Sequence, residues 1–221
     1  MGLLDDLKRQ ADTLRTQTSA KHAAREDNVR VVEEGMHRAF FYILELFKQL
    51  SVLQPVNPLV YSLQGIGDIR DLRYADSFID ARKKKIGDRD VYDYMDFWIK
   101  WSSPASLTVE RDMPPAIAKV RDLLWGSNIK FTEEEVRNAQ RSLVKVVFKI
   151  PAALSTDFTL RADHDNRKLL FYGKNVLRLG KDDFAVPADD FSEATVEELA
   201  KLVLGQPSEF SKRYRTVLPH T

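Results

Sequence analysis

The sequence contains no cysteine. This absence excludes disulfides, thiolate zinc sites and cysteine nucleophiles, and it argues against dependence on an oxidising compartment. Long apolar runs are missing as well. The N-terminus, MGLLDDLKRQADTLRTQ, carries a charge every few positions, so it fits neither a secretory signal nor a transmembrane segment. We therefore expect a cytoplasmic protein that is not an integral membrane protein.

An excess of charge of one sign is also lacking. The chain has 34 basic and 33 acidic residues, and residues 1–55 alone carry eight of each. Proteins that bind nucleic acid normally show a basic footprint, because phosphate neutralisation supplies much of their affinity. No such footprint is visible along the sequence, so nucleic acid is not the partner that the sequence favours.

Recognised catalytic signatures are absent too. The sequence has no GxxxxGK[ST], HExxH or GxSxG motif. Gly65-Ile-Gly67 begins like a dinucleotide fingerprint, but Arg70 takes the third glycine position. The four histidines are scattered and do not pair at metal-ligand spacing. The sequence therefore indicates no cofactor and favours a non-enzymatic protein.

The first clear pattern along the chain is a helical periodicity of apolar residues. Residues 1–50 contain no proline, and apolar residues recur in steps of three and four at Val29, Val32, Met36, Ala39, Ile43, Leu46 and Leu50. This spacing predicts a helix, and the width of its stripe favours a core helix over an intermolecular coiled coil.

A weaker stripe of four residues precedes this helix: Leu4, Leu7, Ala11 and Leu14. Heptad steps from it miss the second stripe by one position, so we expect a break, phase shift or hinge in Gln17–Asn28. Residues 1–52 then form either a helical hairpin or one projecting helix about 70 Å long. The thin stripe predicts contact with a second subunit, a protein partner or, through residues 1–16, a membrane surface.

Beyond Gln54–Pro58 the apolar period changes to two, which predicts a sheet in residues 53–207. We expect a hairpin from residue 72 to residue 101 with a turn at 87–90. Leu143–Ile150 fits a helical face as well as a strand, and its β-branched residues favour the strand; Pro151 limits it in either case. A meander of strands over residues 155–191 includes an extended run at Val176–Leu179.

Three short helices complete the expected domain. They run from Pro114 to Gly126, from a capping pair at Thr132 and Glu135, and from a capping pair at Thr195 and Glu198. Residues 208–221 have no strong period and are expected to be a tail. Grouped strands with hairpin-length links predict an α+β fold with a mainly antiparallel sheet and an N-terminal helical extension or hairpin.

The stretch Arg161-Ala-Asp-His-Asp-Asn-Arg-Lys168 resembles a metal or acid/base cluster. It lies between two strand-like runs, however, and Asp and Asn are typical turn residues. An EF-hand loop is excluded because Lys168 and Lys174 occupy its glycine and glutamate positions. We expect a turn.

Two features of residues 56–103 leave functional alternatives open. Eight aspartates and no glutamate lie there, so a metal-dependent hydrolase or transferase could use the hairpin of residues 68–96, although cross-strand pairing with basic residues is the simpler interpretation. Aromatic residues also alternate with basic ones. They could form a ligand- or nucleic-acid-binding sheet face, or a face covered by a helix, built around Tyr74, Tyr92, Tyr94 and Trp98.

The leading prediction is a protein-interaction or scaffolding protein. It would self-associate or dock a protein partner through the amphipathic stripe from Leu4 to Leu14. The extra helical length and the missing catalytic motifs motivate this prediction.

Overall fold

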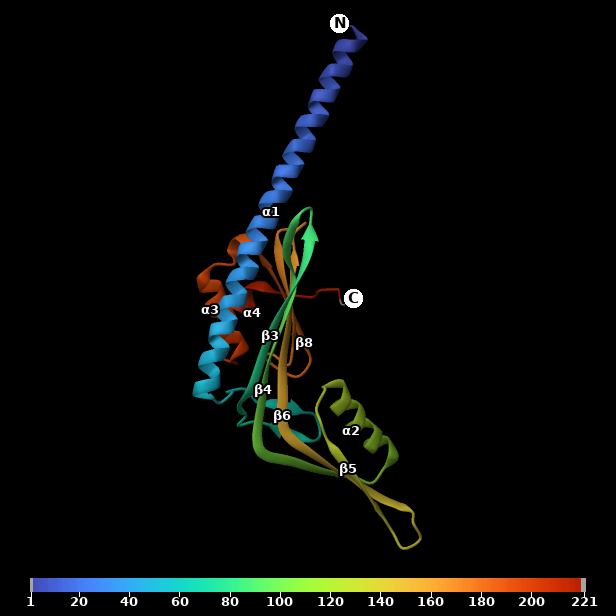
Figure 1. Cartoon of the computed structure of the whole chain (residues 1–221). Helices are drawn as coiled ribbons and strands as arrows, with labels where there is room; N and C mark the ends of the chain where they lie inside the picture. The colour runs from blue at the N-terminus through green and yellow to red at the C-terminus, as the bar shows by residue number, and fades with distance from the viewer. Residues whose placement is uncertain (1, 220–221) are drawn as a thin grey trace.

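A computed structural model describes the backbone of residues 2–219 and all side chains in that range except those of residues 3–6. Figure 1 shows an elongated molecule in which one long helix, α1 (Leu3–Leu53), runs beside an antiparallel sheet and projects far beyond it. The fold is α+β, as predicted, and the N-terminal segment is a projecting extension.

Helix α1 continues through Gln17–Asn28 without interruption, so the predicted break is wrong. This run contains neither proline nor glycine, and nothing in its backbone chemistry stops a helix. The apparent slip of one position also disappears in a straight helix, because 3.6 residues per turn accumulate a different phase from heptad steps of 3.5.

The C-terminal half of α1 packs on the sheet, which confirms the predicted core helix. Val32, Met36 and Ala39 are fully buried, and the Phe47 ring lies 6.4 Å from the Phe97 ring of the sheet, centroid to centroid, in a tilted arrangement. Gly35 allows a close approach, since a Cβ atom there would lie 3.0 Å from Leu169 Cδ1. Helix and sheet therefore share one hydrophobic core.

The main sheet has seven strands in the order β3-β4-β6-β7-β8-β9, with β5 also pairing to β6. Its strands are all antiparallel: β3 (Arg73–Ile86), β4 (Arg89–Arg111), β5 (Thr132–Arg137), β6 (Leu143–Asp163), β7 (Lys168–Lys174), β8 (Lys181–Pro187) and β9 (Arg215–Thr216). The predicted hairpin is confirmed as β3–β4. A separate small sheet pairs β1 (Tyr61–Leu63) with β2 (Gly67–Ile69).

The outer ends of β4 and β6 extend away from the main body and form a lower lobe with β5 and α2 (Pro114–Gly126) (Figure 1). Helix α2 matches its prediction, but the helix predicted at Thr132 is wrong. Residues 132–137 pair with β6 instead, and Arg121 of α2 makes two hydrogen bonds to Glu133, of 2.8 and 2.9 Å. Strand pairing outweighs the local capping pattern.

Strand β6 also runs through Pro151, which was expected to limit it. Pro151 pairs with Ser106 beside a register irregularity between Ser102 and Ser106. Proline is tolerated there because irregular ladder positions do not require its missing N–H group.

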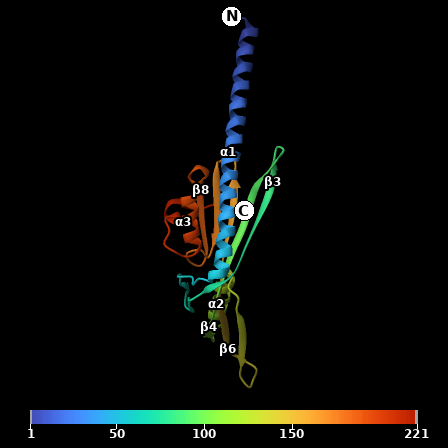
Figure 2. The same cartoon turned by 60° about the vertical axis from the view of Figure 1, so that its left-hand side comes forward.

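The C-terminal region covers the same face of the sheet as α1. The 3-10 turn η1 (Ala188–Asp190), α3 (Glu193–Val203) and α4 (Phe210–Tyr214) follow β8 (Figure 2). Helix α3 begins one turn earlier than predicted: Ser192 is its N-cap and accepts a hydrogen bond from the Thr195 N–H group. The segment after residue 207, expected to be a tail, places Phe210 in the core.

Residues 175–180 form a bend and no strand, so the extended run predicted at Val176–Leu179 is wrong. Asn175 adopts a left-handed conformation, with a φ of 55°, and its amide donates to the Ser155 carbonyl at 3.1 Å. Its own carbonyl accepts from the hydroxyls of Tyr61 and Thr156. This buried polar network fixes the bend between β7 and β8.

Candidate interaction surface

The surface that stands out is the projecting part of α1, residues 3–26, which we call the arm. Every described side chain from residue 7 to residue 26 is exposed, and Leu7 and Leu14 are 52% and 63% exposed. Ala11 lies between them on the same stripe, whereas the side chain of Leu4 lies outside the described residues. At 1.5 Å per residue the arm is about 36 Å long.

The arm stripe, defined by Leu7, Ala11 and Leu14, lies in line with the buried face of α1. Ala11 precedes Val29 and Leu14 precedes Val32 by 18 residues, which is five full turns of an α-helix. Since Val29 and Val32 face the sheet, the arm stripe faces the same side, above the upper end of the sheet. The arm and the top of the sheet therefore enclose a corner (Figure 1).

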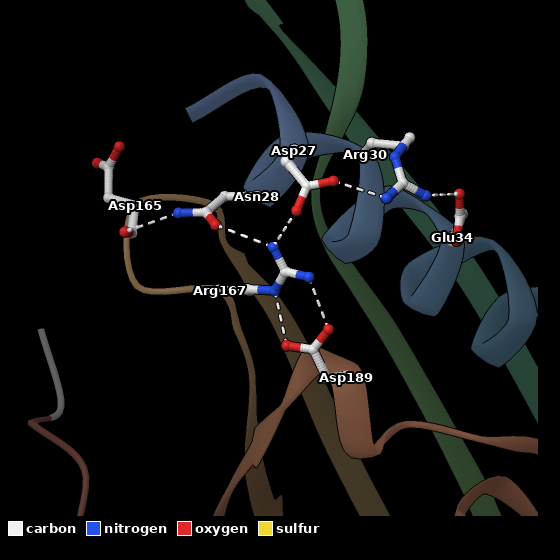
Figure 3. Close-up of polar contacts among 7 residues, drawn as sticks. All are labelled: Asp27, Asn28, Arg30, Glu34, Asp165, Arg167 and Asp189. Carbon is white, nitrogen blue, oxygen red and sulfur yellow. Dashed lines mark hydrogen bonds and ion pairs between the residues drawn. The ribbon is translucent and has the colours of Figure 1, made fainter. Parts of the chain in front are cut away.

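The base of the arm is held by the turn between β6 and β7, which is the stretch that resembled a metal cluster. Arg167 in this turn hydrogen-bonds Asp27 and Asn28 of α1, and it forms two hydrogen bonds of 2.6 Å to Asp189 of η1 (Figure 3). Asn28 also reaches the Asp165 carbonyl. The predicted turn is confirmed, and it joins three elements distant in sequence.

We call Asp27, Asn28, Arg167 and Asp189 the Arg167 cluster. Hydrogen bonds from Arg167 and then Arg30 lower the pKa of Asp27, and the hydrogen bonds from Arg167 lower the pKa of Asp189. Both carboxylates in turn raise the pKa of the Arg167 guanidinium. The cluster therefore favours the charged forms of Asp27, Arg167 and Asp189, and it opposes displacement of α1 from the turn.

His164 of the same turn is buried and contacts α1. Its Nε2 lies 3.3 Å from Glu33 Oε1, and Glu33 Oε1 also accepts a hydrogen bond of 2.7 Å from the Tyr92 N–H group. One acidic side chain thus joins α1 to two strand ends. Sequence reasoning missed this role, because the partners are 59 and 131 residues apart.

The four aromatic residues proposed as a ligand face lie on two faces. Tyr74 and Tyr92 are buried on the α1 side, where Tyr92 lies near Phe40, whereas Tyr94 and Trp98 are half-buried on the opposite side. Register shifts at Tyr74/Asp76 and at Arg82/Lys83 separate them. A bulge adds one residue and reverses the alternation, which a period of two cannot reveal.

The face of the sheet opposite α1 carries an aromatic stack. Phe78 of β3 is 49% exposed and stacks on Trp98 of β4, with ring centroids 5.7 Å apart. Lys100 Nζ lies 4.1 Å from the Trp98 ring centroid. Among the described residues, no helix lies over this part of the face in Figures 1 and 2.

Four aspartates of the β3–β4 hairpin lie beside basic or hydroxyl partners. Lys100 approaches Asp76 at 3.7 Å, Arg82 approaches Asp80 at 3.2 Å and Lys84 approaches Asp93 at 2.8 Å, while Thr159 donates to Asp96. In the part of the chain that the structure describes, no three acidic, histidine or cysteine side chains gather at metal-binding distance. The pairs Asp76–Lys100 and Asp93–Lys84 cross between β3 and β4, as the simpler interpretation expects, whereas Arg82 and Asp80 both lie in β3.

The described helices also include none that is both long and apolar enough to cross a membrane. Together, fold and surface define an α+β protein with a sheet-anchored helical arm. Comparisons with protein-family models, with curated proteins and with solved structures found no match.

Proposed function

We propose that this protein is a non-enzymatic interaction or scaffolding protein that docks a protein through its arm. One observation carries the proposal: the arm extends about 36 Å beyond the sheet and presents Leu7, Ala11 and Leu14 to solvent. A helix of this kind gains most of its stability from packing of its apolar stripe. The Arg167 cluster supports the proposal, because it holds the base of the arm in one direction.

Site-specific photo-cross-linking in the native cells tests this function. A photoreactive amino acid at Leu14 faces the corner, whereas the same group at Thr16 lies about 160° away around the helix. We expect Leu14 to yield a discrete cross-linked product, either a dimer or a heterologous complex, and Thr16 to yield little. The proposal would be refuted if Leu14 gave no discrete product and a chain starting at Ala20 had the same oligomeric state as the full chain.

A second candidate function uses the stack of Phe78 and Trp98. The half-exposed Phe78 ring, with Lys100 beside Trp98, supports binding of a planar or sugar ligand on this sheet face. Tryptophan fluorescence during titration with nucleotides, single-stranded oligonucleotides and oligosaccharides tests it. The Trp98→Phe variant serves as the matched control for assigning the signal, and a flat response across the panel would remove this candidate.

A further inference from the structure

If the arm docks a partner, as proposed above, the charges around the arm stripe indicate which kind of partner binds in the corner. At 100° per residue, Lys8, Arg15, Lys21 and Arg25 lie within about 90° of the centre of the stripe. Glu26 is the one acidic residue on that side between residues 7 and 26. The opposite side of the same interval carries Arg9 and Asp12. The stripe is therefore apolar over residues 7–14, with Lys8 and Arg15 at one border, and it becomes basic from Lys21 to Arg25, where Arg25 lies near its centre.

A flat surface does not fit this stripe. The arm stripe and the buried face of α1 point to the same side, so any plane along the arm would meet the upper end of the sheet (Figure 1). A membrane surface in contact with Leu7 and Leu14 would collide with the β3–β4 hairpin. A single helix, roughly 10–12 Å across with its side chains, can instead lie along the arm beyond the end of the sheet.

A second copy of the chain fits poorly as well. Helices in contact lie 8–10 Å apart. Two parallel arms in contact would therefore force the sheets that pack on α1 after residue 27 into the same space. In an antiparallel pair with Leu7 opposite Leu14, Lys8 of each copy comes beside Arg15 of the other. Like charges at the border of a stripe oppose that pairing.

From this geometry we infer that the arm binds an acidic amphipathic helix of another protein. Its apolar residues pack on Leu7, Ala11 and Leu14, and its carboxylates pair with Lys8 and Arg15 at one border of the stripe. Lys21 and Arg25 extend the basic surface toward the sheet. Arg25 lies 3.7 Å from Asp165 and Arg15 lies 3.7 Å from Asp12, and an incoming carboxylate would replace these exposed pairs.

Two synthetic peptides of about three heptads test the inference. Both carry leucine at the a and d positions; one has glutamate and the other lysine at the e and g positions. We expect the full chain to bind the glutamate peptide about tenfold more tightly than the lysine peptide at low salt, with the difference shrinking at high salt. Fluorescence anisotropy of labelled peptides measures both affinities.

Charge reversal supplies the matched variants. Lys8→Glu combined with Arg15→Glu should invert the peptide preference, whereas Arg9→Glu, on the opposite side of the helix, should leave it unchanged. The chain starting at Ala20 should bind neither peptide. Equal affinity for both peptides, or no binding of either, overturns the inference.

Two further outcomes separate this inference from the proposed function. A full-length dimer in light scattering that dissociates on truncation to Ala20 would retain the docking arm but reject the acidic partner. Arm-dependent binding to vesicles of phosphatidylserine and phosphatidylcholine would reject a helical protein partner. Failure of both peptides together with a silent Leu14 cross-linker would reject the arm as a docking surface altogether.

Discussion

Single side chains connect the C-terminal segment to the rest of the fold, and Glu198 shows how. Its carboxylate accepts a hydrogen bond of 2.7 Å from Lys201 Nζ and another of 2.7 Å from the Glu209 N–H group. The Ser208 hydroxyl donates to the Glu198 backbone carbonyl. Helix α3 therefore holds the start of α4, and with it the buried ring of Phe210.

These hydrogen bonds predict a pH dependence. Lys201 first, and then the Glu209 N–H group, lower the pKa of Glu198 from 4.5 to about 2. A folded-state pKa below the unfolded one stabilises the protein above the unfolded value, and this stability is lost as the pH falls from about 4.5 to about 2. The melting temperature of wild type should exceed that of Glu198→Gln at pH 7.

The same comparison at acidic pH checks the cause. Between pH 4.5 and 2 the wild type should lose more stability than Glu198→Gln, so the two melting temperatures should converge. A constant difference across the pH range would show that the Glu198 carboxylate is not responsible. The lowered pKa values of Asp27 and Asp189 act in the same direction in both proteins.

At the scale of elements, α1 is joined to the sheet by packing of its buried face, from Val29 to Leu50, and by the Arg167 cluster at the base of the arm. The cluster and the ion pair between Arg25 and Asp165 connect the base of the arm to the rest of the fold, and the described side chains of residues 7–26 are exposed. We therefore expect it to determine where α1 begins to fray.

Arg167→Ala should release this contact. Amide hydrogen exchange in residues 24–30 should become faster, while exchange in the buried strands should change little, because local opening does not require global unfolding. Arg137→Ala is the matched control, because Arg137 belongs to β5 of the lower lobe and pairs with Glu135 at 2.6 Å. Equal exchange in the two variants would contradict an anchoring role.

Helices and turns were predictable where local chemistry determines the secondary structure, and strands were less predictable where pairing with a distant segment determines it. The periodicity of α1, the turn after β3 and the Pro114 helix start are local signals that the fold obeys. The capping pattern at Thr132 is equally clear, yet strand β6 offers those residues a partner. A sequence pattern contains no information about that neighbour.

The candidate interaction surface was likewise predictable only in part. The arm stripe was predictable from its spacing, but its direction was not, because heptad steps suggested a phase slip that a straight helix does not have. The aromatic face was predicted on alternation alone, and two bulges divide it. The anchoring of Arg167 required knowledge of which turns lie beside α1.

At the scale of the whole molecule, the two ends of the chain make unequal contributions to stability. None of the described side chains of residues 7–26 is buried, whereas Phe210 near the C-terminus is fully buried between Phe171 and Phe184. Their removal should have correspondingly different effects.

Thermal unfolding of two shortened chains tests this contrast. A chain starting at Ala20 should melt at the temperature of the full chain, because the buried face of α1 begins at Val29. A chain ending at Pro207 should lose at least the roughly 3–5 kcal/mol that deletion of a buried phenylalanine costs. A stabilising contribution from residues 1–19 in the monomer would mean that the arm folds back.

The five-turn spacing between the arm stripe and the buried face makes the arm sensitive to its length in a way that its exposed composition conceals. Every residue inserted between Gln17 and Glu26 turns Leu7 and Leu14 by about 100° relative to the sheet, while a substitution there leaves their direction unchanged. Natural variation in this stretch should therefore tolerate many exchanges of side chain and few insertions or deletions. The direction of the arm stripe therefore depends on the number of residues between the stripe and the sheet and not on their identity.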